Sequence, residues 1–245
     1  MVIDNKIVFI PIPKNASWSV EDTCIQYGFD LKYKNTLWSN SIKLNEKDNN
    51  KHIHTTINDL LDSFGNKFEY VSIIRNSTDR FISAWKFFIS SMEGELNDTH
   101  LSTKIKNLDN IFLMEFIKEN YLEIPSSYNS IQIGIDLLIK LLNKMGIESA
   151  LNIDESFKKK YAGHIVSFIS QYQWVLNNQT KVKQFNFEKL NEFESYMSNK
   201  LNVDFKLLHQ NKTKLDYCAV KKTDELIFFV DKYIDGMYKS NKSII

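Results

Sequence analysis

Two short stretches of the sequence place cationic and hydroxyl side chains directly after an apolar run. In the first, "KIVFIPIPKNASWSV", the run Ile7–Ile10 ends at prolines and is followed by Lys14, Ser17 and Ser19. Pro13 cannot donate to a strand ladder, so we expect a strand to end there and a helix to begin near the serines, which can cap it. The N–H groups of a helix start, a lysine and two hydroxyls together suit a phosphate or sulfate group. An ordinary strand–helix turn with a surface lysine is the alternative.

The second stretch, "VSIIRNSTDRFISAWKFF", repeats this arrangement. Arg75 stands at the end of a hydrophobic run, Ser77 or Thr78 can cap the helix that follows, and Ser83 lies on its first turns. A guanidinium group and a hydroxyl that converge on one phosphate form strong, charge-assisted hydrogen bonds. This stretch therefore indicates a second anion-binding position.

The elements that must position these residues alternate between strand and helix. Apolar runs predict strands at about 7–11, 69–75 and 181–187. Apolar spacing and end signals predict helices at about 17–28, 56–63, 77–91, 110–121, 128–145, 188–200 and 222–239, with loops at about 32–50 and 93–109. Such alternation predicts an α/β domain with a central, mostly parallel sheet flanked by helices. Ligands of these sheets lie beyond the carboxyl ends of the strands, where both stretches stand.

Composition excludes several classes of protein. Lys plus Arg number 31 and Asp plus Glu number 30, so a net charge of +1 gives no field that would draw nucleic acid or a membrane. The two cysteines form no CxxC pair, which excludes a zinc ribbon and a disulfide framework. No run approaches the ~18 apolar residues of a membrane span, and no signal peptide is recognised. We therefore expect a cytoplasmic protein.

Together the two stretches resemble the sulfotransferase superfamily, which uses 3′-phosphoadenosine-5′-phosphosulfate (PAPS). "IPKNASWS" resembles the superfamily's 5′-phosphosulfate loop, and "IIRNSTDRFISAW" resembles its 3′-phosphate motif. "FNFEKLNEF" and "HQNKT", in the last third of the chain, are similar to elements of the carbohydrate-type and bacterial branch. The resemblance implies a P-loop-like fold for residues 1–245 as a single domain, with a variable helical, acceptor-side segment at about 92–165.

The resemblance also implies roles for particular residues. His54 is the expected catalytic base, with His52 as the second choice, and Lys14 is the cation that stabilises the leaving phosphate oxygen. The residues expected to bind the donor are Lys14, Asn15, Ala16, Ser17, Trp18 and Ser19 at the phosphosulfate, and Arg75 and Ser83 at the 3′-phosphate. Candidates of lower rank are His164, His209 and Glu188, while Asn211 and Lys212 are candidates to close over the nucleotide. No metal is expected, since no acidic cluster accompanies the loops.

The predicted activity is transfer of a sulfuryl group from PAPS to an acceptor hydroxyl. Likeness to the carbohydrate branch suggests a glycan as the acceptor, by analogy alone. A nucleotide kinase or other P-loop phosphotransferase is an alternative, but it should show GxxxxGK[ST] and an acidic Mg²⁺ ligand. A non-catalytic nucleotide- or glycan-binding module of the same fold is the other alternative. The sequence gives no oligomeric state.

Overall fold

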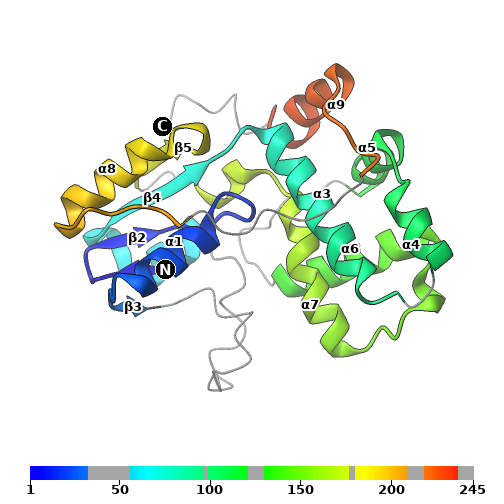
Figure 1. Cartoon of the computed structure of the whole chain (residues 1–245), viewed down its shortest axis with the longest axis horizontal. Helices are drawn as coiled ribbons and strands as arrows, with labels where there is room; N and C mark the ends of the chain where they lie inside the picture. Colours follow the sequence, from blue (N-terminus) through cyan, green and yellow to red (C-terminus); the bar gives the residue numbers. More distant parts are fainter. Residues whose placement is uncertain (33–55, 97–98, 121–129, 177–179, 209–217, 237–245) are drawn as a thin grey trace. The chain divides into compact units, whose positions relative to one another are not determined.

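The computed structural model describes residues 1–32, 56–96, 99–120, 130–176, 180–208 and 218–236, which we call the described residues (Figure 1). The chain divides into two compact units. The first, here called the sheet unit, comprises Met1–Asn76, Gln171–Asn211 and Tyr238–Ile245. The second, here called the helical unit, comprises Ser77–Ser170 and Lys212–Met237 and includes the segment that the sequence marks as variable.

A five-stranded sheet forms the centre of the sheet unit among the described residues, with the strand order β3-β1-β2-β4-β5. The strands are β1 (Val2–Ile3), β2 (Ile7–Phe9), β3 (Leu31–Lys32), β4 (Glu69–Ile74) and β5 (Val182–Asn186). β4 lies between β2 and β5 and pairs parallel with both, whereas β1 pairs antiparallel with β2 and β3. The predicted α/β class is therefore confirmed, with a mixed sheet in which β2, β4 and β5 pair in parallel and β1 pairs antiparallel with both of its neighbours.

The antiparallel part of the sheet depends on a tight turn. Asp4 and Asn5 both have left-handed backbone angles, with φ of 50° and 52°, and Lys6 N donates to Ile3 O at 3.0 Å. Two left-handed residues in sequence are the mark of a type I′ turn, which joins paired strands and favours Asp and Asn. Two-residue strands carry no periodic signal, so the sequence predicts neither β1 nor β3.

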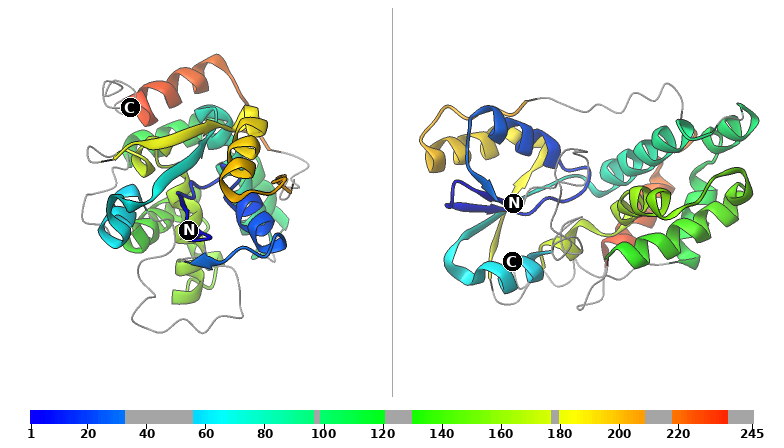
Figure 2. Two further views of the ribbon diagram at one scale, coloured as in Figure 1. Left: turned by 90° about the vertical axis from the view of Figure 1, so that its left-hand side faces the viewer. Right: turned by 90° about the horizontal axis from the view of Figure 1, so that it is seen from below.

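Helices cover both faces of this sheet. Figure 2 shows α1 (Ser17–Gln26) and α8 (Leu190–Leu201) on one face and α2 (Ile57–Phe64) on the other. Side chains alternate along β4, since Val71 and Ile73 enter the core that α1 and α8 share with the sheet. Tyr70 points to the other face, where its hydroxyl donates to Gly65 O at 2.5 Å, just after α2. The sheet is thus buried on both sides, as its apolar strands predict.

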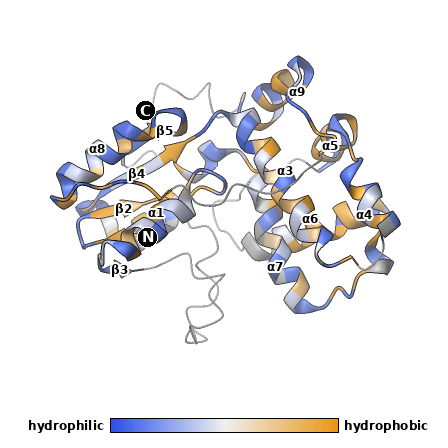
Figure 3. Ribbon diagram, in the orientation of Figure 1, coloured by the Kyte–Doolittle hydropathy of each residue, from blue (hydrophilic) through white to orange (hydrophobic). Residues whose placement is uncertain are grey.

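The helical unit contains α3 (Ser77–Glu93), α4 (Thr99–Lys106), α5 (Asn110–Glu119), α6 (Ser130–Met145), α7 (Glu155–Ile165) and α9 (Asp224–Phe229). Figure 3 shows apolar and polar residues alternating along these helices, and their apolar residues form one core around Trp85, Leu138 and Tyr161. The expectation of a loop at 93–109 is wrong, because α4 lies within it. Its sequence is polar, and only Leu101 and Ile105 pack against the core.

The predicted closing helix also differs from the structure. α9 ends at Phe229, and the chain continues as a single π-helical turn over Val230–Ile234. The short 3-10 helices are Gly65–Lys67, Glu148–Ala150, Val166–Phe168, Gln171–Trp174 and Phe187–Lys189. Two of them, Gln171–Trp174 and Phe187–Lys189, lie in the sheet unit and contribute to the site described below.

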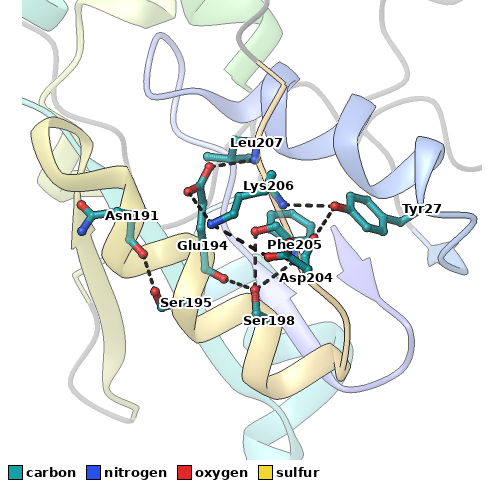
Figure 4. A network of polar contacts seen from close by, with 9 residues as sticks. All are labelled: Tyr27, Asn191, Glu194, Ser195, Ser198, Asp204, Phe205, Lys206 and Leu207. Atoms are coloured by element: carbon teal, nitrogen blue, oxygen red, sulfur yellow. Dashed lines mark hydrogen bonds and ion pairs between the residues drawn. The ribbon is translucent and has the colours of Figure 1, made fainter.

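A polar network fixes the segment that follows α8 (Figure 4). Asn202 ends α8 in a left-handed conformation, with φ of 57°, and the chain then returns alongside α8 and α1. Backbone and side-chain groups of both helices hold it there. The bonds join Tyr27 Oη to Asp204 O (2.5 Å), Phe205 N to Ser198 Oγ (2.9 Å), Leu207 N to Glu194 Oε1 (2.9 Å) and Leu208 N to Thr23 Oγ1 (2.9 Å).

Candidate functional site: two cations at adjacent strand ends

The site lies where β2 and β4 end, side by side. The two strands are parallel neighbours, with Val8 opposite Tyr70, so their carboxyl ends meet at one edge of the sheet. Lys14 to Ser19 follow β2, and Arg75 follows β4 directly. The two motifs that the sequence singles out are therefore brought together. We call this group, Lys14–Ser19 with Arg75, the strand-end site.

The loop before α1 has an unusual backbone for residues that carry side chains. Lys14 and Ala16 are both left-handed, with φ of 67° and 62°. Each such residue costs about 1 kcal/mol or more, which persists only where the surroundings hold it in place. Left-handed residues in a turn direct successive N–H groups into a concavity that binds anions. The loop thus adopts, without glycine, left-handed backbone angles that glycine adopts most readily.

The start of α1 adds further N–H groups, although the expected serine caps are absent. The N-cap is Ala16, and no side chain caps the helix. Ser17 instead donates back to Ile12 O at 2.7 Å, which closes the turn. The first intrahelical bond joins Val20 N to Ala16 O, so the N–H groups of residues 17–19 precede the hydrogen-bonded ladder. The helix start therefore has the polarity that favours an anion.

Arg75 is held on three sides. Its backbone N–H donates to Gln171 Oε1 at 3.0 Å, and its Nη1 donates to Lys14 O at 3.4 Å. Its guanidinium carbon lies 4.6 Å from the centre of the Phe187 ring, a cation–π contact. Next to it, Asn76 N donates to Glu188 Oε1 at 3.1 Å, so Glu188 holds the chain just after Arg75. The side chain of Arg75 is thus positioned by two segments distant in sequence.

The surroundings of Lys14, Arg75 among them, disfavour its charged form. Burial, and then the positive charge of Arg75, lower the pKa of the Lys14 ammonium group from 10.5 to about 8. Both effects disfavour the charged form of Lys14, and a bound anion would favour that form by supplying the opposite charge. A lysine whose pKa is lowered by burial and by a specific charged neighbour marks a candidate functional site.

A buried amide chain links the two loops. Asn15 Nδ2 donates both to Ile73 O and to Gln171 Oε1, at 2.9 Å each, and Gln171 Nε2 donates to Arg75 O at 2.7 Å. The side chain of Asn15 therefore turns inward and holds the loop to β4. Sequence reasoning missed Gln171, which lies in a segment without pattern. It also missed the contact of Phe187, although "FNFEKLNEF" contains that residue.

The other predicted residues differ in their surroundings. Trp18, within the strand-end site, is 45% exposed at the start of α1, and Ser83 is half-buried on α3, which belongs to the helical unit. His164 lies in α7 and is 2% exposed, with its ring 4.5 Å from Phe87, which suits packing. The residues that fall outside the described ones are the catalytic candidates His52 and His54, and His209, Asn211 and Lys212 of "HQNKT".

Two features are absent from the described residues. They contain no helix that is long and apolar enough to cross a membrane. They also contain no group of three or more His, Cys, Asp or Glu side chains placed to hold a metal ion.

Comparison of the chain with protein-family models, with curated proteins and with solved structures found no significant match. The site's chemistry must therefore be argued from its own residues.

Proposed function

We propose that this protein is a sulfotransferase that transfers a sulfuryl group from PAPS to a hydroxyl group of a carbohydrate. The acceptor oxygen attacks sulfur, the bond between sulfur and the 5′-phosphate oxygen breaks, and that oxygen leaves with the electron pair. Lys14 stabilises the charge on the leaving oxygen, and His54 accepts the acceptor's proton. Transfer of this kind needs alignment and charge stabilisation more than covalent chemistry.

The observation that carries the proposal is the convergence of Lys14 and Arg75. Two cationic groups from separate motifs lie close enough for Arg75 Nη1 to donate to the carbonyl of Lys14. PAPS carries two separate anionic groups. Lys14, with the left-handed loop and the start of α1, can bind the 5′-phosphosulfate, and Arg75 can bind the 3′-phosphate. The parallel β2 and β4 with α1 between them in sequence agree with the P-loop-like fold that we propose.

Two alternatives differ from this proposal. A P-loop kinase would wrap the phosphates with a glycine-rich loop, whereas residues 11–19 contain no glycine, and β4 is followed by Arg75 rather than by an acidic Mg²⁺ ligand. A binding module without chemistry would need the same two cations to hold the nucleotide, so it differs from the proposed enzyme in lacking transfer, which the second experiment below measures. The two cysteines form no disulfide, which agrees with the cytoplasmic location that we propose.

Titration calorimetry tests the donor. The wild-type protein is titrated with adenosine 3′,5′-bisphosphate and with ATP, and the measurement is repeated for Arg75→Met. We expect the wild type to prefer the bisphosphate and Arg75→Met to lose at least about tenfold in affinity, because a charge-assisted pair contributes roughly 1.5–3 kcal/mol. Lys189→Met, which removes an exposed cation of the same unit, is the matched control and should bind as the wild type does. Preference for ATP would contradict the proposal.

Transfer itself is tested with labelled PAPS and a panel of glycans. His54→Ala should keep the wild-type affinity for the bisphosphate and lose transfer to any acceptor that the panel reveals. His52→Ala should keep both the affinity for the bisphosphate and the transfer, since we propose that His54, and not His52, accepts the acceptor's proton. Unchanged turnover in His54→Ala would remove His54 from the mechanism, and binding without transfer to any hydroxyl would favour the non-catalytic module.

A further inference from the structure

We propose that Gln171 is a positioning residue that fixes the distance between the Lys14 loop and Arg75, so that the two anion-binding positions act as one. The inference rests on the proposed function, because it concerns how a donor with two anionic groups is recognised. No pattern in the sequence points to Gln171. It begins a short 3-10 helix that is distant from both motifs along the sequence.

The side chain of Gln171 contacts both motifs at once. Its Oε1 accepts from Asn15 Nδ2 at 2.9 Å and from Arg75 N at 3.0 Å, and its Nε2 donates to Arg75 O at 2.7 Å. The amide thus pairs with both backbone groups of Arg75, as a neighbouring strand would, at the point where β4 has ended. With its remaining acceptor capacity it binds the loop that carries Lys14.

Backbone partners fix the orientation of both amides. Gln171 faces an N–H and a carbonyl of the same residue, so its oxygen and nitrogen cannot exchange places without losing both bonds. That orientation leaves an acceptor toward Asn15, whose nitrogen also donates to Ile73 O at 2.9 Å. Each hydrogen bond between β4, Gln171 and the loop therefore pairs a donor with an acceptor in this one orientation of the two amides. Only an amide of this length offers the donor and the acceptor that the position needs.

Burial makes this link rigid. Gln171 is 1% exposed and Asn15 is 0% exposed, so water does not compete for their hydrogen bonds. Movement of the loop away from β4 would leave buried donors and acceptors without partners, and the free-energy cost of that loss opposes the movement. Asn15 lies between the left-handed Lys14 and Ala16, so the same bonds maintain the strained backbone of the loop. Gln171 therefore holds the geometry of the site although it need not touch the donor.

A fixed distance between two cations favours a ligand with two anionic groups at a matching distance. If the loop were free of β4, each cation would still bind one group, but binding of the first would no longer align the second. Loss of Gln171 should consequently affect a nucleoside bisphosphate strongly and a nucleoside monophosphate little. A residue that served only general stability would weaken both equally.

The test compares Gln171→Met, which keeps size and removes the hydrogen bonds, with the control Gln184→Met. Gln184 is half-exposed on β5, and the same chemical change there should leave binding unaltered. Asn15→Ala is a second variant, which releases the loop but keeps the pairing of Gln171 with Arg75. Circular dichroism confirms folding. Calorimetry then measures the affinity of each variant for adenosine 3′,5′-bisphosphate and for adenosine 5′-monophosphate. A double-mutant cycle of Lys14→Met and Arg75→Met, made in the wild type and in Gln171→Met, measures the coupling between Lys14 and Arg75 in bisphosphate binding.

We expect Gln171→Met and Asn15→Ala to weaken bisphosphate binding by about 5–150-fold, the usual range for coupling between two positions. Gln171→Met should weaken monophosphate binding by less than about threefold. The coupling between Lys14 and Arg75 should vanish in the Gln171→Met background. Equal losses for both nucleotides, or coupling that persists, would overturn the positioning role while leaving the proposed function intact.

A measurement without nucleotide separates the two claims. Nuclear magnetic resonance of the Lys14 side chain should show its pKa rise in Gln171→Met, from about 8 toward its ordinary value of 10.5, as the released loop moves away from burial and from Arg75. If the wild type does not bind the bisphosphate, the proposed function fails. An unchanged pKa of Lys14 in Gln171→Met would by itself refute the positioning role.

Discussion

Replacing Lys14 by methionine should make the folded protein more stable while it weakens binding of the proposed donor. The ammonium group of Lys14 is partly buried and faces the charge of Arg75, and these two effects lower its pKa from 10.5 to about 8. Since one pKa unit corresponds to about 1.4 kcal/mol, the charged lysine destabilises the folded state by up to roughly 3 kcal/mol. Methionine fills similar space without the charge, and the left-handed backbone remains in both proteins.

The pH dependence gives the sign of the effect. Below pH 8, Lys14 is protonated in both the folded and the unfolded state, so the full cost is present. Between about pH 8 and 10.5 the folded state releases the proton while the unfolded state retains it, so the wild type gains stability relative to Lys14→Met as the pH rises. Groups common to both proteins cancel in this difference.

Denaturant unfolding of both proteins at pH 7, 8, 9 and 10 provides the assay. We expect Lys14→Met to exceed the wild type by about 1–3 kcal/mol in the free energy of unfolding at pH 7, and the difference to shrink toward pH 10. The exposed Lys181 supplies the control, and Lys181→Met should change little at any pH. A Lys14→Met protein that is less stable at pH 7, or a difference that does not change with pH, would refute the electrostatic reasoning.

Three further predictions concern packing and titration within each unit. Gly134→Ala should destabilise the helical unit by about 1–3 kcal/mol in thermal unfolding, because the new Cβ would lie 2.7 Å from Ala162 O; unaltered stability would mean that α6 and α7 can separate. Tyr27→Phe should lower the free energy of unfolding by about 1 kcal/mol, since the hydroxyl of Tyr27 donates to Asp204 O at 2.5 Å. Denaturant unfolding measures this change, and an unchanged free energy of unfolding would mean that water replaces the bond. Burial, and then Glu21, raise the pKa of the Cys24 thiol to about 12, so iodoacetamide should modify it only after unfolding, which mass spectrometry detects. Rapid labelling in the folded state would contradict that pKa.

Much of the sheet and of its helices could be predicted because the apolar pattern is strong there. The runs before Pro11 and Arg75 form β2 and β4, and the alternation in "KVKQFNF" forms β5. Parallel pairing of these strands follows from the helices between them, and with it the meeting of the two motifs at one sheet edge. This part of the site depends on local patterns, which a sequence shows directly.

The rest depends on contacts that leave no local pattern. Gln171 is one polar residue among several in its segment, and its role exists only because β4 ends opposite it. The cap of α1 is Ala16 rather than a serine, because the turn satisfies Ser17 through Ile12 O. α4 is polar on most of its surface and gains its stability from two apolar side chains in the core. Propensity alone could not foresee such tertiary effects.

Each unit is built from segments that are far apart along the chain, and this has a consequence for synthesis on the ribosome. The sheet unit needs β5, α8 and the segment at 204–208, which binds α1 through Tyr27 and Thr23, and the core of the helical unit includes Leu226 and Phe229 of α9. Neither unit can therefore bury its core until nearly the whole chain has emerged, and contacts of such long range form slowly. No single cut releases either unit intact, so a chain truncated after residue 176 should expose both cores together and depend on chaperones.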